Sequence, residues 1–344
     1  MLRLIEKHSS ISVVGMAKNT GKTTCLNHLI RRLRNEGRHC AVTSIGVDGE
    51  ERDVLYRTPK PRITVHEGML FVTSETDFTN RECPAETLAV SDRSTPLGRL
   101  VTARAQGTGT VVLSGPSDSQ WLCETLADLK RRGASLTLVD GALSRMSLAS
   151  PAVTDALILC TGAALTGILP ELIRQTQFRC TLIDLNAVEP PLAAPLQMLG
   201  SGVWIFDEIN GNHLKLTNSV FTGYETAGYP VTAEGSLPAE YPVAAPTLYV
   251  SGAVTEPFFK TLSARRYAGT TLIVRDFTRL FIEPATYEKF TRRGGHIRVL
   301  QKAALLAVCT NPVAPQGQRF DPLLLRNALR NALPWPVYDV MQKD

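Results

Sequence analysis

Hydrophobic and polar positions follow two alternating patterns along this chain. Short apolar runs, typical of strands buried inside a sheet, are separated by stretches in which apolar residues recur every three or four positions, as in helices. The runs that predict strands cover residues 11–14, 39–46, 110–114, 136–142, 155–160, 180–185, 247–251, 270–274, 303–309 and 337–340. The alternation predicts an α/β fold built on a doubly wound, mostly parallel sheet.

The clearest helical stretch follows the first strand. Its apolar positions lie at helical spacing, arginines occupy the other face, and Gly37 is placed to end the helix. A second helix is predicted over residues 121–132, because Ser117 and Gln120 have the spacing of a capping box. The apolar positions of the first helix are Cys25, Leu26, Leu29, Ile30 and Leu33.

Other segments give weaker patterns. Residues 62–73 predict a hairpin that turns at Glu67-Gly68, residues 74–96 predict a polar loop, and residues 97–105 predict a short helix. Between residues 186 and 246, prolines and glycines are frequent and no helical period is evident, so we expect an irregular insert with a small β subdomain near 202–221. The predicted division is a core over 1–186, a proline-rich insert over 187–246, and a C-terminal half over 247–344 that completes the core.

Composition narrows the class of protein. The chain has 344 residues, 44% hydrophobic and 20% charged, with a net charge of +5, which is too mild to indicate a nucleic-acid partner. No apolar run reaches the length of a membrane span and the first residues lack a signal-peptide core, so we expect a cytoplasmic protein with no membrane partner. The seven cysteines are scattered without a C-x-x-C pair, which favours small core residues over a metal or disulfide set.

Positive charge is concentrated late in the chain. Residues 260–302 hold ten Lys and Arg against three acidic residues, a local excess of +7. A solvated face and a docking surface for an acidic partner are both consistent with this excess.

The candidate chemistry lies between the first strand and the first helix. Gly15-Met-Ala-Lys-Asn-Thr-Gly-Lys-Thr-Thr24 has the G-x-x-x-x-G-K-[ST] spacing of a phosphate-binding P-loop, and it has the required strand before it and helix after it. The glycines let backbone N–H groups approach phosphate, Lys22 adds a positive charge, and Thr23 is expected to hold Mg²⁺ through its hydroxyl. The residues expected to contact nucleotide are Gly15, Lys18, Asn19, Thr20, Gly21, Lys22, Thr23 and Thr24.

Three further polar side chains follow predicted strands. Asp48, with Glu50 and Asp53 as alternatives, follows the second strand and is a candidate for activating water or contacting Mg²⁺, although an ordinary acidic turn gives the same pattern. Asp140 ends the strand 136–142 in the Walker B manner and is expected to support the metal. Asn311, fixed between strand and prolines, can present a donor and an acceptor to an adenine edge, or can form a simple Asn-Pro turn.

Taken in order, the P-loop followed by Thr-Thr, the Asp about 26 residues after its lysine, the strand ending in Asp140-Gly-Ala and the strand ending in Asn311-Pro resemble the SIMIBI class of P-loop NTPases. The resemblance implies that Lys22, Asp48 and Asp140 are catalytic, that Thr23, Asp48 and Asp140 bind Mg²⁺, and that Asn311 reads the base. The sequence has no N/TKxD guanine motif, which favours ATP as the nucleotide. Members that act as dimers carry a second lysine directly after the first glycine, where this chain has Met16; a homodimer remains open.

A narrower resemblance uses motifs from both ends of the chain. The P-loop, Gly46-Val-Asp-Gly-Glu, Val139-Asp-Gly-Ala-Leu-Ser-Arg, Ala149-Ser-Pro, Thr154-Asp and Pro334-Trp-Pro-Val-Tyr-Asp-Val are similar to the P-loop subunit that reactivates lysine 5,6-aminomutase and ornithine aminomutase. The resemblance implies an ATP-driven, chaperone-like reactivating factor that acts on an adenosylcobalamin-dependent aminomutase together with a MutS-like partner subunit.

Two other functions stay open from the residues. A biosynthetic kinase or ligase related to dethiobiotin synthetase would use the same loop, although the Asp140-Gly-Ala stretch lacks the further glycines of that family. A nucleotide-binding module without catalysis would need the loop but neither Asp48 nor Asp140.

Overall fold

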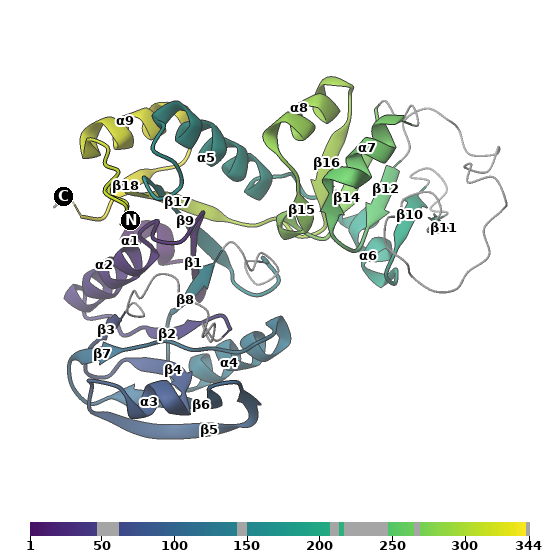
Figure 1. Ribbon diagram of the computed structural model, residues 1–344. Coiled ribbons are helices and arrows are strands. Elements are labelled where there is room, and N and C mark those ends of the chain that lie inside the picture. The colour runs from purple at the N-terminus through teal and green to yellow at the C-terminus, as the bar shows by residue number, and fades with distance from the viewer. Residues whose placement is uncertain (47–61, 143–149, 207–212, 217–246, 265–268, 342–344) are drawn as a thin grey trace. The chain divides into compact units, whose positions relative to one another are not determined.

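The computed structural model describes residues 1–46, 62–142, 150–206, 213–216, 247–264 and 269–341. The chain divides into two compact units, Met1–Gln177 with Ala304–Asp344, and Phe178–Ala303. Each unit contains its own sheet, and the two are described separately below (Figure 1). Within the described ranges, no helix combines the length and apolar character needed to cross a membrane.

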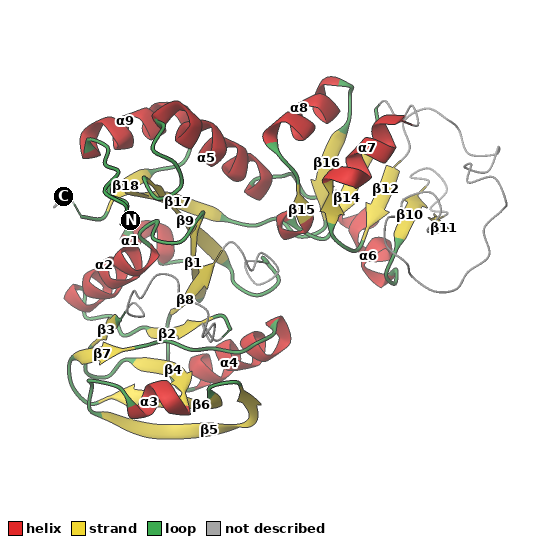
Figure 2. Cartoon of the chain, in the orientation of Figure 1, coloured by secondary structure: helices red, strands yellow, loops and turns green. Residues whose placement is uncertain are grey.

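The first unit is built on a nine-stranded sheet in the order β18-β17-β9-β1-β8-β2-β4-β6-β5 (Figures 1 and 2). Neighbours from β18 to β4 run parallel, whereas β4, β6 and β5 pair antiparallel. The unit is therefore α/β with a large, mostly parallel mixed sheet, as the alternating pattern predicts. The strands are β1 (Ser10–Gly15), β2 (Ala41–Ser44), β4 (Leu70–Ser74), β5 (Ala85–Thr95), β6 (Gly98–Ala105), β8 (Thr137–Ala142), β9 (Ala156–Gly162), β17 (Leu305–Asn311) and β18 (Val337–Asp339).

Helices cover both faces of this sheet, which is compatible with a doubly wound fold. Leu138 of β8 packs in the cluster that contains the apolar stripe of α2, whereas its neighbour Val139 packs with Leu122 of α4. Burying a side chain of this kind stabilises the fold by about 1.5–3 kcal/mol. The helices of the first unit are α1 (Leu2–Ile5), α2 (Lys22–Asn35), α3 (Glu75–Thr79), α4 (Ser119–Arg131) and α9 (Pro322–Ala332), and α5 (Leu169–Ile183) crosses into the second unit.

The two helices predicted with the most support are confirmed. All five apolar positions expected on α2 are buried, and Gly37, with φ +69°, lies just beyond its end. In α4 the cap is Asp118, whose side chain accepts a hydrogen bond from the amide of Trp121, and not the predicted Ser117. An Asp at this position satisfies an otherwise orphan amide as well as Ser does.

The segment from 62 to 105 differs from its prediction. β3 (Ile63–Val65) pairs antiparallel with β7 (Gly109–Val111) and not with β4, so the turn at Gly68 does not close a hairpin. The expected loop 74–96 contains α3 and β5, and the expected helix 97–105 is β6. Hydrophobic periodicity does not predict these strands, because β5 and β6 form a hairpin whose turn is stabilised by a side chain of α3.

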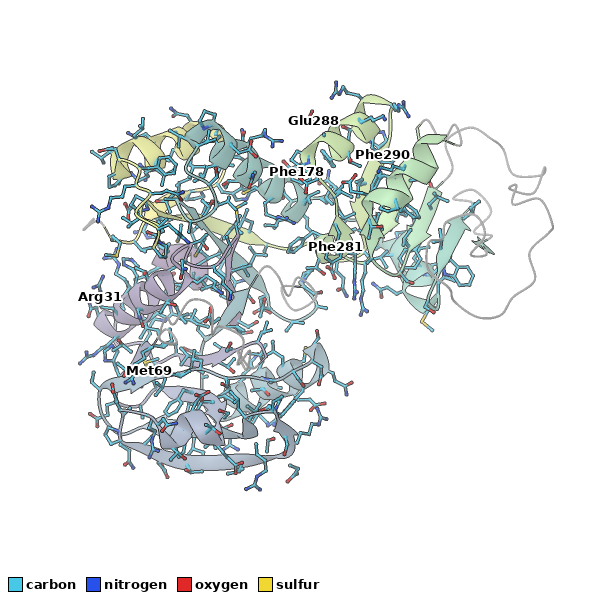
Figure 3. All side chains as sticks on the ribbon, in the orientation of Figure 1. Arg31, Met69, Phe178, Phe281, Glu288 and Phe290 are labelled. Carbon is cyan, nitrogen blue, oxygen red and sulfur yellow. The ribbon has the colours of Figure 1, made fainter. Side chains whose placement is uncertain are left out.

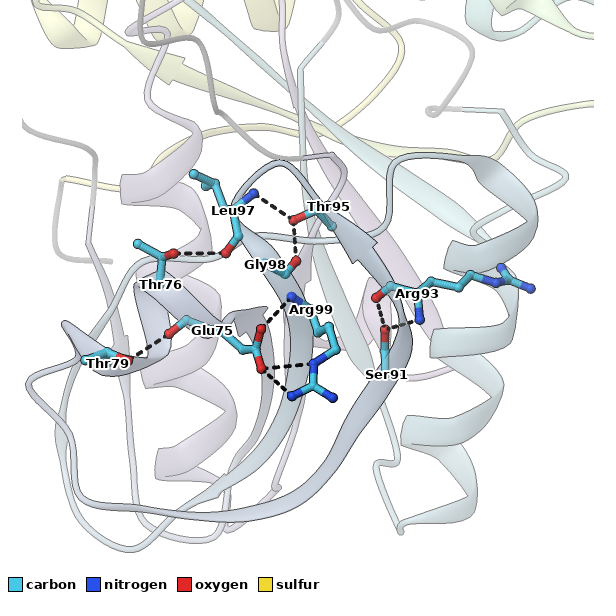
Figure 4. A network of polar contacts seen from close by, with 9 residues as sticks. All are labelled: Glu75, Thr76, Thr79, Ser91, Arg93, Thr95, Leu97, Gly98 and Arg99. Atoms are coloured by element: carbon cyan, nitrogen blue, oxygen red, sulfur yellow. Dashed lines mark hydrogen bonds and ion pairs between the residues drawn. The ribbon is translucent and has the colours of Figure 1, made fainter.

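That turn joins β5 to β6 at Gly98, whose φ is +93° (Figure 4). The hydroxyl of Thr95 donates to the carbonyl oxygen of Gly98 at 2.7 Å and accepts from the amide of Leu97 at 3.1 Å. Glu75 of α3 accepts hydrogen bonds from the amide of Arg99 at 2.9 Å and from its guanidinium at 2.8 Å. The hairpin is therefore fixed by a residue more than twenty positions away.

The second unit has a five-stranded sheet in the order β11-β10-β12-β14-β16 (Figure 1). The last three run parallel, and β10 is antiparallel to β11 and β12. On α8, Phe290 meets Phe259 of α7 edge to face at 5.0 Å between ring centres (Figure 3). The elements are α6 (Pro190–Met198), β10 (Val203–Phe206), β11 (His213–Leu216), β12 (Thr247–Val250), β13 (Val254–Thr255), α7 (Glu256–Ala264), β14 (Thr271–Val274), a short 3₁₀ helix (Phe277–Arg279), β15 (Leu280–Phe281), α8 (Pro284–Arg292) and β16 (His296–Val299).

This unit corrects three sequence predictions. The apolar run 180–185, expected to be a strand, ends helix α5, because Leu172, Thr176 and Cys180 are fully buried at a spacing of four. The insert expected to be irregular over 187–246 begins with helix α6, and its predicted β region near 202–221 contains β10 and β11, which join the five-stranded sheet instead of forming a separate subdomain. Residues 247–303 belong to the second unit, and of the predicted C-terminal half only residues 304–344 complete the first sheet.

Candidate functional site

Loop 15–22 leaves the centre of the first sheet. β1 lies between β8 and β9, all three parallel, so the loop emerges at the carboxyl edge with a neighbouring strand on each side. The amide of Met16 donates to the carbonyl oxygen of Cys160 at 2.9 Å, which ties the start of the loop to β9. Asn19 and Gly21 both have positive φ, +62° and +92°. Ligands of open α/β sheets bind at this edge, where strand order reverses.

Position 15 has room only for glycine, because later residues of the same loop pass close to it. A Cβ at this position would lie 2.5 Å from the hydroxyl oxygen of Thr20 and 2.8 Å from Cγ of Lys22. Thr20 is itself held by its hydroxyl, which donates to the carbonyl oxygen of Ala17 at 2.9 Å. The loop therefore closes over the end of β1 in a way that only glycine admits.

The first turn of α2 supplies backbone donors. The first intrahelical bond runs from the amide of Cys25 to the carbonyl oxygen of Gly21 at 2.9 Å, so the amides of Lys22, Thr23 and Thr24 precede the helical ladder. The side chains of these three residues are half-buried. Such a helix N-terminus attracts an anion by about 0.3–2 kcal/mol.

Lys22 lies close to a carboxylate on β8, the strand next to β1. Its ammonium nitrogen lies 3.9 Å from Oδ1 of Asp140, and the two side chains are 22% and 19% exposed. Asp140 is on β8, in register with Val13 of β1 and Ser44 of β2. Two of the three residues predicted to be catalytic, Lys22 and Asp140, are therefore brought together at the carboxyl edge.

Asn311 also reaches the loop. It ends β17, and its side-chain nitrogen donates to the carbonyl oxygen of Asn19 at 2.9 Å. Its side-chain oxygen accepts from the amide of Val313 at 3.2 Å. The predicted adenine contact of Asn311 stays a prediction, but its amide group already has partners within the protein.

Buried hydroxyls continue the same edge and were not singled out from the sequence. Ser44 ends β2 and Ser74 ends β4, and Asp77 accepts hydrogen bonds from Ser74 at 3.0 Å and from Ser114 at 2.5 Å. Asp77 is 8% exposed. The only signal in the sequence is that Ser44, Ser74 and Ser114 lie in or next to apolar runs, which is too common to be used alone.

Three thiols lie beneath the loop. Cys25 of α2, Cys160 of β9 and Cys309 of β17 are fully buried or nearly so, and Sγ of Cys25 lies 3.4 Å from Sγ of Cys309. The hydrogen bonds among the three thiols raise and lower each pKa in turn, and complete burial holds the pKa of each thiol well above its ordinary value. Six of the seven cysteines are buried and all seven are free thiols, as expected for core residues.

The amino edge of the sheet carries a carboxylate of a different kind. Asp155 accepts hydrogen bonds from the amide of Ser9 at 2.7 Å, its hydroxyl at 2.8 Å, and the amide of Ser10 at 3.0 Å. Burial opposes ionisation, but the hydrogen bonds from Ser9 and Ser10 outweigh it, so the pKa of Asp155 is lowered. This residue, part of the Thr154-Asp motif, ties β1 to β9 away from the loop.

The remaining predicted residues are placed less fully. Asp48, Glu50 and Asp53 lie outside the described residues. Lys18 is exposed on the loop. In the basic segment, Lys302 pairs with Asp184 at 3.0 Å, and the other described lysines and arginines are mostly exposed, which suits a solvated face and a docking surface equally.

The residues at the edge suit a magnesium nucleotide better than a metal held by protein alone. Across the described ranges, no group of three or more His, Cys, Asp or Glu side chains is arranged to hold a metal ion. Mg²⁺ is usually bound by one or two carboxylates together with substrate phosphates, and Asp140 with the hydroxyl of Thr23 supplies a donor set of that kind. Comparison of the chain with protein-family models, with curated proteins and with solved structures finds no match.

Proposed function

We propose that this protein binds and hydrolyses ATP with Mg²⁺ as a P-loop NTPase of the SIMIBI type. The observation that carries the proposal is the tightly closed loop 15–22, which brings Lys22 to 3.9 Å from Asp140 at the carboxyl edge of the central strands. A positive charge, helix-terminal amides and a carboxylate then surround one position. That combination suits a triphosphate with its metal ion.

Each residue has a separate role in this proposal. Lys22 and the amides of the first turn of α2 bind phosphate oxygens, and Thr23 and Asp140 hold Mg²⁺, which when bound neutralises phosphate charge. Without nucleotide, the carboxylate of Asp140 balances the ammonium group of Lys22 and keeps it near the loop. Asp48 activates the attacking water, a role supported by its place after the second predicted strand and by the resemblance.

We further propose that the hydrolysis energy acts on a protein. The resemblance to the reactivating factor of lysine 5,6-aminomutase and ornithine aminomutase supports an adenosylcobalamin-dependent aminomutase as the target and a MutS-like subunit as partner, in the cytoplasm. Nucleotide-dependent shapes of the loops near Asp48 and Asp140 would bias the conformation of that partner. The exposed basic residues between 260 and 302 supply a docking surface for acidic partners.

The test measures phosphate release from Mg-ATP by the purified chain, alone and with an aminomutase holoenzyme carrying inactivated cobalamin plus its MutS-like subunit. We expect slow hydrolysis by the chain alone and a severalfold increase with the complete set. Fast turnover that no protein stimulates would contradict the regulatory function while leaving ATP hydrolysis intact.

A kinase or ligase remains the second candidate, and one observation favours it. The buried hydroxyls of Ser44 and Ser74 end β2 and β4, and Ser74 and Ser114 both bond to Asp77, so polar groups lie beside the phosphate-binding edge, where a small polar acceptor could be held. The discriminating result is a metabolite that raises ADP formation in a one-to-one ratio with a phosphorylated or ligated product. Ser114→Ala would then raise the KM for that metabolite but not for ATP.

A further inference from the structure

Asn311 is bonded to three separate segments at the carboxyl edge. Its side-chain nitrogen donates to the carbonyl oxygen of Asn19 in loop 15–22, and its side-chain oxygen accepts from the amide of Val313. Its backbone oxygen accepts from the amide of Ala163, which follows β9, at 2.9 Å. One residue therefore joins the phosphate-binding loop, the end of β9 and the segment after β17.

Two glycines make room for this residue. A Cβ on Gly162 would lie 2.0 Å from the backbone oxygen of Asn311, and a Cβ on Gly21 would lie 3.0 Å from its Cβ. Gly21 also has φ +92°, which side chains rarely adopt. The contact between Asn311 and the loop is therefore close on both sides and not an incidental approach of two surfaces.

The orientation of the amide is fixed by its partners. A carbonyl oxygen can only accept and a backbone amide can only donate, so the nitrogen must face Asn19 and the oxygen must face Val313. Each end of the amide thus has one partner inside the protein, which fixes the direction of the group and leaves one N–H and one lone pair for any other contact. The side-chain nitrogen supports Asn19, whose backbone lies in the left-handed region with φ +62°. A non-glycine residue in that region needs support from its surroundings.

We propose that Asn311 is a positioning residue that holds loop 15–22 in its phosphate-binding shape, and that it does not select the base. The inference rests on the proposed function of the loop, but it assigns Asn311 a different role from the adenine contact expected from the sequence. Loss of its hydrogen bond to Asn19 should weaken every ligand that uses the loop, whether or not the ligand has a base.

The experiment compares Mg-ATP with Mg-tripolyphosphate, which has the phosphates but no base, by calorimetry on the full chain. We expect Asn311→Ala to weaken both about three- to tenfold, the equivalent of one hydrogen bond. The matched control is Asn80→Ala, since the side chain of Asn80 also donates to a backbone oxygen, that of Thr76 at 3.0 Å, but at the C-terminal end of α3. The control should change neither affinity.

Asn311→Asp separates the two side-chain contacts. It keeps an oxygen that accepts from Val313, loses the donor to Asn19 and adds a negative charge near the phosphates, so it should weaken both ligands more than Asn311→Ala does. Weaker binding of ATP alone in either variant would mean that Asn311 reads the base, and unchanged binding of both ligands would mean that the loop does not need it. Either result overturns the inference.

A second readout does not depend on nucleotide. In the ligand-free protein, hydrogen exchange of the amides of residues 16–24 should be faster in Asn311→Ala than in wild type, and unchanged in Asn80→Ala. If wild type binds neither ATP nor tripolyphosphate, the proposed function fails, and the exchange experiment still decides the role of Asn311. Equal exchange in the two variants would overturn that role.

Discussion

The sheets of the two units are built alike, but the polar residues at the carboxyl ends of their strands have different roles. Both carry parallel strands with polar residues at their carboxyl ends. In the second unit those residues serve local structure: Asp276 is fully buried and accepts from the amide and hydroxyl of Thr278, and the hydroxyl of Ser251 accepts from the amide of Gly202. In the first unit, Lys22, Asp140 and Asn311 instead surround one loop.

Strand order accounts for the difference. In the second unit β12, β14 and β16 follow one another in a single direction across the sheet. In the first unit β8 lies on one side of β1 and β9, the next strand along the chain, lies on the other, so the order reverses at β1. The reversal sends successive loops apart and opens the carboxyl edge to a ligand. The comparison predicts that matched substitutions at the two edges have different kinds of effect.

The largest difference is expected between two lysines that each face an aspartate. Lys22→Ala should lower ATP hydrolysis about 100-fold or more, because it removes the positive charge that stabilises the transferring phosphate. Lys302→Ala, which breaks the exposed pair with Asp184, should leave hydrolysis unchanged and alter stability by at most about 1 kcal/mol. Steady-state phosphate release and thermal melting measure the two effects. Equal rates for wild type and Lys22→Ala would remove the loop from the chemistry.

The next difference concerns two glycines that follow central strands. Gly15→Ala places a Cβ against Thr20 and Lys22 and should weaken ATP binding about tenfold or more, since overpacking of this kind costs about 1–3 kcal/mol. Gly252, which comes two residues after β12, has no atom within 4 Å of its would-be Cβ. We expect Gly252→Ala to bind ATP like wild type in the same titration, and a loss in both variants would mean that glycine acts through general stability.

A smaller difference separates two aspartates at strand ends. Asp140→Asn should lower hydrolysis about 10- to 100-fold with little change in melting temperature, because it removes a charge near Lys22 and the metal. Asp276→Ala should keep its hydrolysis rate and lose about 0.5–2 kcal/mol of unfolding free energy, because it removes a helix cap. Full activity in Asp140→Asn would favour a binding module without catalysis.

The smallest effect is expected at the amino edge. The pKa of Asp155 is lowered in the folded protein, so its ionised form adds stability above the pKa of the unfolded chain, about 3.9, and this stability is lost as pH falls through the folded value. Asp155→Asn should therefore melt slightly below wild type at pH 7 and approach it in acid, with hydrolysis at pH 7 unchanged. A melting difference that stays constant with pH would assign the effect to packing alone.

The centre of the site could be predicted from the sequence because each part is local. Gly15, Gly21 and Lys22 have a fixed spacing between a strand and a helix whose patterns are clear, and Asp140 ends an apolar run. Parallel pairing of β1 with β8 then brings the two together. The spacing of these residues was therefore enough to predict which of them lie together at the loop.

The parts that failed depend on contacts distant in sequence. The hairpin at Gly98 needs Glu75, and the run 180–185 takes its helical form from burial that starts at Leu172. A short apolar run has the same composition in a buried helix and a buried strand. Strands β12 and β14 were predicted, but they were assigned to the half that completes the core, because a buried apolar run does not show which sheet it joins. The adenine contact of Asn311 stays a prediction, and the hydrogen bond of its side chain to Asn19 could not be predicted because only the fold brings the two residues together.

The three buried thiols beneath the loop provide a way to measure how often the start of α2 opens. Their raised pKa values keep them protonated and slow to react with alkylating reagents at neutral pH while α2 stays against β9 and β17. Labelling of Cys25 must wait for the start of α2 to lift, whereas the exposed Cys123 reacts without such an opening. The ratio of the two labelling rates therefore times the opening of the helix that begins at Lys22, and a ligand that holds this helix would slow one rate and leave the other unchanged.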